Sequence, residues 1–207
     1  MIFISLIIYD YILEKKFTDL FIISLSLNLI LWTKAEGIVY FLIIISCINL
    51  IKKINFSHRL IFNILCLSLI IFKFLVYQAF EIKPNSQPYS LNFFENFNFE
   101  ILFYQIYNIT IYFVYNSINN IIYFVALIVF FMNRDKIFRE EYYKVVFAFF
   151  FITICFIYSA YIFRDQEIID ALKTTIDRVV FTSSGFYLFF ICLYLRKLSK
   201  FRDRFSI

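Results

Sequence analysis

The chain has 207 residues, of which 62% are hydrophobic and 23% aromatic, and its mean hydropathy is +0.79. Soluble domains are about 45–50% apolar and are much richer in Gly and Pro than this chain, which has 2 of each. A chain of this length cannot bury so much apolar surface away from water, which excludes a soluble globular enzyme. The net charge of +5 is spread over loops between apolar segments, which argues against a nucleic-acid partner and for a lipid bilayer.

Seven apolar segments predict an all-α, polytopic membrane protein with about seven transmembrane helices, in a single membrane domain over residues 1–207. The first segment covers only about 18 Å of a hydrocarbon core about 30 Å thick, and it contains Asp10. We therefore expect it to be an incomplete helix, and the chain to be the C-terminal portion of a larger protein. The segments are residues 2–13, 17–33, 38–51, 60–80, 109–132, 145–163 and 179–195.

The loops between these segments alternate in charge. One set contains 14 Lys and Arg residues against 5 Asp and Glu residues, whereas the other contains 5 against 8. Because cytoplasmic loops carry an excess of Lys and Arg, we expect the first set and the C-terminus in the cytoplasm of a bacterium, with the protein in its inner membrane. The second set is then external and consists of residues 33–37, 81–105 and 164–178.

The two longer external segments have different patterns. Residues 81–105 include both prolines and then alternate aromatic residues with Asn and Glu, which predicts an extended loop in the headgroup region. Residues 164–178 place Ile169, Leu172 and Ile176 at helical spacing among charged residues. This pattern predicts an amphipathic helix on the membrane surface, separate from the last span.

The two glycines, Gly37 and Gly185, both lie beside external polar segments. Gly37 ends the turn Trp32-Thr-Lys-Ala-Glu-Gly, where it either provides the turn geometry or lets a ligand approach the backbone. In the same turn, Lys34 and Glu36 form either a structural ion pair or a site for an anionic phosphate.

Lys73 is an ionisable residue inside a predicted span, about 10 Å from its external end. It either extends its side chain to the surface or lines a polar external cavity that receives an anionic ligand. The cysteines are isolated in apolar runs and the single histidine lies in a basic loop, so no metal cluster or disulfide is predicted. We predict no cofactor, with a divalent metal left open.

Two stretches, LILWTKAEGIVYFLIII (29–45) and LKTTIDRVVFTSSGFYLFF (172–190), resemble the later half of bacterial GT-C-type membrane glycosyltransferases. In that family, a T-K-x-E-G turn joins two short helices, and an S/T-x-x-D-R stretch enters the last spans. The aminoarabinose transferases have a similar turn, and the protein O-mannosyltransferases share the wider architecture.

The resemblance implies transfer of a sugar from a polyprenyl-phosphate carrier to a lipid, glycan or protein acceptor on the external face, with inversion at the anomeric carbon. The family's catalytic acid lies in a first external loop that has no counterpart here. The catalytic residue is therefore unknown. Either the chain is a truncated product, or it pairs with a separately encoded N-terminal half that supplies the acid, or the resemblance does not extend to function. The resemblance places the donor phosphate at Lys34, Arg178 and Lys73, with Glu36, Gly37, Asp177 and Gly185 supporting them.

Two other classes of function stay open. A permease subunit or assembly factor would act without a lipid-linked sugar, and a transporter would show inverted repeats or helices broken at the membrane midplane. No internal repeat is evident in the sequence. A polymerase or ligase of surface polysaccharide would have larger external loops rich in Arg.

Overall fold

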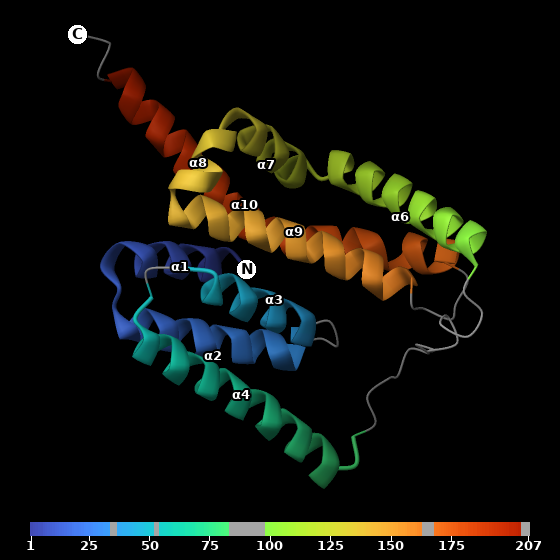
Figure 1. The fold of residues 1–207 in the computed structure, drawn as a ribbon, viewed down its shortest axis with the longest axis horizontal. Helices are drawn as coiled ribbons and strands as arrows, with labels where there is room; N and C mark the ends of the chain where they lie inside the picture. The colour runs from blue at the N-terminus through green and yellow to red at the C-terminus, as the bar shows by residue number, and fades with distance from the viewer. Residues whose placement is uncertain (34–36, 52–53, 83–97, 163–167, 204–207) are drawn as a thin grey trace. The chain divides into compact units, whose positions relative to one another are not determined.

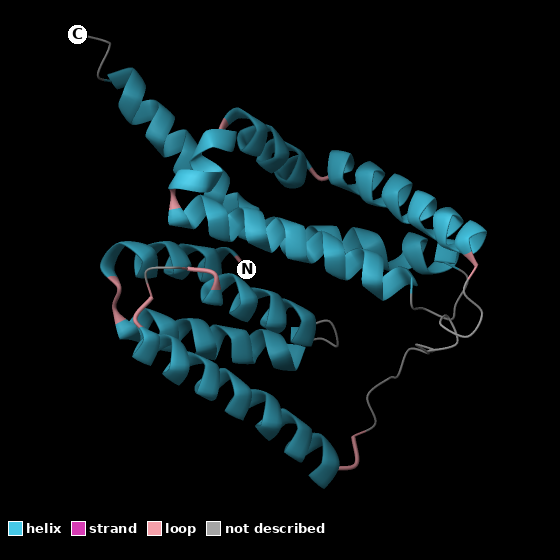
Figure 2. Cartoon of the chain, in the orientation of Figure 1, coloured by secondary structure: helices cyan, strands magenta, loops and turns pink. Residues whose placement is uncertain are grey.

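The computed structural model describes residues 1–33, 37–51, 54–82, 98–162 and 168–203, and these form helices joined by turns (Figure 1, Figure 2). Within these ranges there is no β-strand, which confirms the all-α prediction. The helices are α1 (Ile2–Glu14), α2 (Phe17–Thr33), α3 (Gly37–Asn49), α4 (Phe56–Ala79), α6 (Phe99–Asn119), α7 (Ile121–Met132), α8 (Arg134–Arg139), α9 (Glu141–Ile162) and α10 (Ile168–Asp203).

The chain folds into two compact units. The Lys73 unit consists of Leu6–Gln87 and Arg139–Phe156. In it, α2, α3 and α4 pack against one another in pairs. The Tyr187 unit consists of Met1–Ser5, Pro88–Phe138 and Ile157–Ile207. In it, α6, α7 and α10 pack in the same pairwise manner.

Three helices among the described residues are long and apolar enough to cross a membrane: α4, α9 and the part of α10 from Thr175 to Arg196. The pair α6 and α7 makes a fourth if the two form one span. The sequence prediction of seven spans is therefore wrong in number. The reason is length, because α2 and α3 have 17 and 13 residues and cover about 26 and 20 Å of a core about 30 Å thick.

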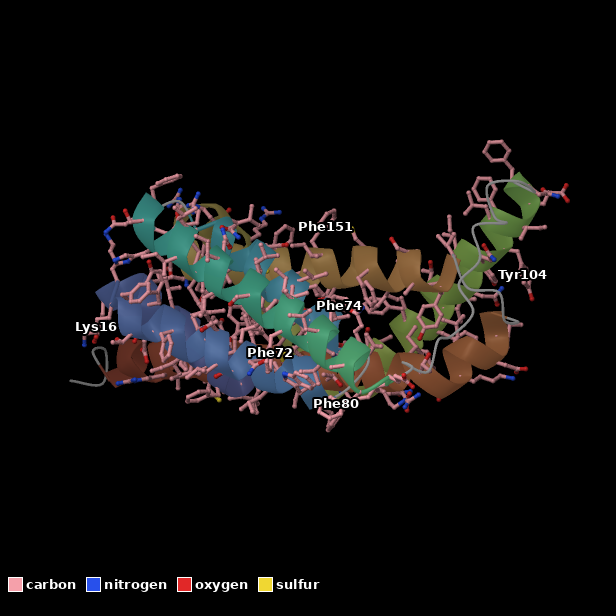
Figure 3. The ribbon with its side chains drawn as sticks, turned by 90° about the horizontal axis from the view of Figure 1, so that it is seen from below. Lys16, Phe72, Phe74, Phe80, Tyr104 and Phe151 are labelled. Atoms are coloured by element: carbon pink, nitrogen blue, oxygen red, sulfur yellow. The ribbon has the colours of Figure 1, made fainter. Side chains whose placement is uncertain are left out.

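The surface of α4 shows why it suits a bilayer. Of its 24 residues, Phe62, Cys66 and Lys73 are buried, and their spacing places them on one stripe of the helix. Large apolar side chains cover its other faces, including Phe72 and Phe74, which are 57% and 59% exposed (Figure 3). Apolar surface of this extent is unfavourable in water and stable in lipid.

The start of α6 corrects the extended loop expected over residues 81–105. The helix begins at Phe99, so residues 99–105 are helical, while residues 83–97 lie outside the described part of the chain. Asn98 has an extended backbone, and its side chain accepts a hydrogen bond from the Glu100 backbone N–H at 2.8 Å. This Asn cap explains why the helix starts here.

A break at Asn120 divides the single span expected over residues 109–132. The Asn120 backbone N–H donates to the Asn116 carbonyl at 3.0 Å and ends α6. Its side chain accepts a hydrogen bond from the Tyr123 backbone N–H at 3.1 Å and starts α7. One residue thus caps both helices, and the chain bends there by 96°.

The last helix, α10, continues without interruption from Ile168 to Asp203. This corrects the prediction of a surface helix over residues 164–178 that is separate from the last span. The reason is a continuous buried stripe, which begins in the charged region and extends into the apolar one. Its members include Leu172, Ile176, Val180, Tyr187 and Phe190.

Candidate functional site

Lys73 of α4 places its ammonium group at the C-terminal end of α2. Its Nζ donates a hydrogen bond to the Leu31 carbonyl oxygen at 2.5 Å, and the residue is 8% exposed. The carbonyls in the last turn of a helix have no partner further along the helix and carry the negative end of its dipole. The ammonium therefore supplies both a hydrogen-bond donor and a positive charge to the end of α2.

Two aromatic rings lie against this ammonium. Nζ is 5.2 Å from the ring centroid of Tyr77 and 5.9 Å from that of Trp32. The two rings contact each other at 6.1 Å, and Trp32 Nε1 donates to the Asn28 side-chain oxygen at 3.0 Å. The faces of such rings attract a cation. We call Leu31, Trp32, Lys73 and Tyr77 the Lys73 cluster.

Gly37, the first residue of α3, lies directly against the end of α2. A Cβ atom at this position would overlap the Ile30 carbonyl oxygen and lie 3.3 Å from the α-carbon of Leu31. Neither described glycine has a positive φ, so it is this close approach that requires glycine at position 37. The residue thus has a structural role in joining α2 to α3.

Lys34 and Glu36 lie between these helices in the sequence, outside the described residues. Their ion pair and their role in phosphate binding stay predictions. The chain on either side of them is described, and the Lys73 cluster and Gly37 contact the helix that leads into the turn.

Asp177, Arg178 and Gly185 lie on α10 in the Tyr187 unit. Asp177 and Arg178 are exposed, and the Arg178 backbone N–H donates to the Asp177 carboxylate at 2.7 Å. At Gly185, an added Cβ would lie 3.3 Å from the Met1 Cβ atom, so this glycine allows α10 to approach the start of α1. The predicted phosphate ligands Lys73 and Arg178 therefore belong to different units.

A buried aromatic cluster in the Tyr187 unit is absent from the sequence prediction. The rings of Tyr123 and Tyr187 are fully buried, with centroids 5.0 Å apart and planes at 80°. The side chains of Tyr187 and Ser183 lie near the Tyr123 hydroxyl. Phe130 and Phe190 stack at 4.9 Å, with Phe130 also against Tyr187. We call these five residues the Tyr187 cluster.

The sequence signal for this cluster is weak. Ser183 and Tyr187 are four residues apart on α10 and so share a face, but aromatic residues are too common in this chain for the spacing to stand out. Within the ranges that the structure describes, no group of three or more His, Cys, Asp or Glu residues could hold a metal ion.

Comparison of the chain with protein-family models, with curated proteins and with solved structures finds no match. The described helices place the chain in a class, the helical membrane proteins. The likeness to GT-C glycosyltransferases stays a hypothesis that depends on the two sequence stretches quoted above.

Proposed function

We propose that the chain is part of a bacterial membrane glycosyltransferase that transfers a sugar from a polyprenyl-phosphate carrier to a lipid, glycan or protein acceptor on the external face. One observation carries the proposal. The T-K-x-E-G sequence begins at the C-terminal end of α2. The buried Lys73 ammonium donates a hydrogen bond to this helix end, and Gly37 approaches it closely. A lysine between two apolar helices suits a ligand with an anionic head and a lipid tail.

In this proposal Lys34 binds the donor phosphate, and Arg178, in the other unit, is tested separately as a phosphate ligand. Both cations can donate to phosphate oxygens, and Arg can do so through two parallel hydrogen bonds. In this proposal Glu36, two residues after Lys34, and Asp177, directly before Arg178, orient these cations.

Binding of farnesyl phosphate, a short lipid phosphate, tests these roles in protein reconstituted into nanodiscs. We expect Lys34→Ala and Arg178→Ala each to weaken binding about tenfold or more, because each removes a charge-assisted hydrogen bond. Lys144→Ala is the matched control, since Lys144 pairs with Glu141 at 3.0 Å at the start of α9. If both variants bind farnesyl phosphate as tightly as the wild-type protein, Lys34 and Arg178 are not part of the site. The same follows if protein carrying these substitutions transfers sugar at the wild-type rate.

The orientation also belongs to this proposal. If α6 and α7 form one span, the four spans α4, α6–α7, α9 and α10 leave the basic loops and the C-terminus on one side, as the charge pattern predicts. A phosphatase reporter that is active only outside the cytoplasm should be active after residues 97 and 165, and inactive after residues 135 and 203. Activity after residue 135 would mean that α6 and α7 return to the external side.

A second candidate function is non-enzymatic transport or assembly. It is favoured by the 96° bend at Asn120, because transporters build their substrate sites at broken helices. This alternative predicts that Asn120→Ala impairs function while Lys34→Ala does not. It also predicts that farnesyl phosphate has no measurable affinity for the protein.

A further inference from the structure

Lys73 occupies a position that would ordinarily hold an apolar residue. It lies on the buried stripe of α4, seven residues after Cys66, and it is 8% exposed. Removing an ammonium group from water is costly unless its charge and its donors find partners. The structure shows such partners, because the Leu31 carbonyl accepts its hydrogen bond and the rings of Trp32 and Tyr77 lie against it.

The same contacts hold the last turn of α2. Lys73 fixes the Leu31 carbonyl, and Trp32 is fixed both by Asn28 on its own helix and by Tyr77 on α4. Gly37 then brings α3 against the Ile30 carbonyl. Three consecutive residues, 30 to 32, are thus held from two other helices immediately before the turn that contains Lys34.

We infer that Lys73 is a positioning residue for the last turn of α2, residues 30–33, rather than a ligand of the donor phosphate. The inference rests on the proposed function for the identity of the ligand, and on the Lys73 cluster for the mechanism. A lysine that binds phosphate directly has to present its ammonium group to the ligand. Here the ammonium is buried, and it stabilises the C-terminal end of α2, which precedes Lys34 in the sequence.

Hydrogen exchange of the intact protein in nanodiscs tests the positioning role without any ligand. Lys73→Met keeps the length of the side chain and removes its charge and donors. We expect exchange of the amides of residues 30–33 to become at least tenfold faster, with no change in peptides of α10. Lys73→Arg should restore slow exchange, because a guanidinium group can donate to the carbonyl and stack on the rings. Lys144→Met is the matched control.

A second variant covers the case in which Lys73→Met fails to fold. Tyr77→Leu removes one ring but leaves the hydrogen bond to Leu31, so it should give a smaller increase of exchange in the same segment. Wild-type exchange of residues 30–33 in both Lys73→Met and Tyr77→Leu would overturn the inference.

Ligand binding separates failure of this inference from failure of the proposed function. We expect Lys73→Met to weaken farnesyl phosphate binding together with faster exchange, and Lys73→Arg to restore both. Inorganic phosphate, as a second probe, shows whether the lipid tail is needed. Weakened binding with unchanged exchange would make Lys73 a direct ligand and overturn the inference. If the wild-type protein binds neither probe, the proposed function fails, while the exchange result still decides the role of Lys73.

Discussion

The Lys73 unit and the Tyr187 unit accommodate polar groups among apolar helices in different ways. In the Lys73 unit, a buried ammonium is shared between a backbone carbonyl and two aromatic rings. In the Tyr187 unit, the buried polar side chains within the described residues are uncharged, and the hydroxyl groups of Tyr123, Tyr187 and Ser183 gather among stacked rings. The charge is placed where a helix ends, whereas the neutral hydroxyls lie within helices that continue.

The two units can be followed separately. The chain has a single tryptophan, Trp32, which lies in the Lys73 cluster, so its fluorescence reports on the Lys73 unit. Hydrogen exchange in α7 and α10 reports on the Tyr187 unit. A variant in the Lys73 unit should therefore change Trp32 fluorescence more than exchange in α7 and α10, and a variant in the Tyr187 unit should do the reverse.

The largest effect should come from Tyr187→Ala. Tyr187 is fully buried and its ring contacts Tyr123 and Phe130, so truncation removes a large part of the aromatic core. We expect a loss of about 3–5 kcal/mol in the free energy of unfolding, measured by exchange of the most protected amides in α7 and α10. Tyr187→Phe keeps the ring and should cost no more than about 1.5 kcal/mol. If both variants lost the same free energy of unfolding, the hydroxyl group of Tyr187, and not its ring, would be the group that stabilises this cluster.

Gly37→Ala should destabilise the Lys73 unit by about 1–3 kcal/mol, because the new Cβ meets the Ile30 carbonyl oxygen, which is backbone and cannot turn away. Urea unfolding followed by Trp32 fluorescence measures it. Gly185→Ala is the matched control in the other unit, where the nearest atom is the Met1 Cβ atom at 3.3 Å. A Trp32 transition that shifts equally in both variants would contradict the close approach described at Gly37.

Asn120→Ala should cost about 0.5–2 kcal/mol, because it removes the side-chain cap of α7. Circular dichroism during thermal unfolding measures this loss. The adjacent Asn119, the last residue of α6, is exposed and provides the control Asn119→Ala. Equal destabilisation by the two substitutions would mean that the cap does not determine where the helix breaks.

The smallest effect should come from Lys16, which forms an exposed ion pair with Glu14 between α1 and α2. The hydrogen bond that Lys16 donates to Glu14, and the negative charge of that carboxylate, raise the pKa of Lys16 above the ordinary value of 10.5. A raised lysine pKa stabilises the folded state below the ordinary pKa, and this contribution is lost as the pH rises through the raised value. Lys16→Gln should therefore lower the melting temperature slightly at pH 7 and not above the raised pKa. Added salt should reduce the difference, and a difference that persists in strong alkali would exclude the ion pair as its cause.

The position of most helices follows from the sequence because charged or polar residues border the apolar runs. The expected segment 17–33 has the same bounds as α2, and the segment 145–163 falls almost entirely within α9. The break at Asn120 and the continuity of α10 were not predicted. Hydropathy reflects composition, and it does not register an extended backbone at one residue or a buried stripe that crosses a charged region. The polar run Asn-Ser-Ile-Asn-Asn at 116–120 is the signal that marks the break.

The candidate site is predictable only in part. The sequence indicates that Lys73 is unusual, because a lysine within an apolar run needs a partner. It does not indicate which partner, because the acceptor is a backbone carbonyl 42 residues away, and every residue has one. The importance of Gly37 follows from the rarity of glycine in this chain, whereas its cause, contact with the end of α2, depends on how two helices pack.

The bend between α6 and α7 depends on very few degrees of freedom. Asn120 is the one residue between the end of α6 and the start of α7, so its φ of −90° and ψ of 101° largely set the angle between the two helices. With its 12 residues, α7 is a lever about 18 Å long. A torsional change of about 10° at Asn120 would move the far end of that lever by about 3 Å, close to the diameter of one atom.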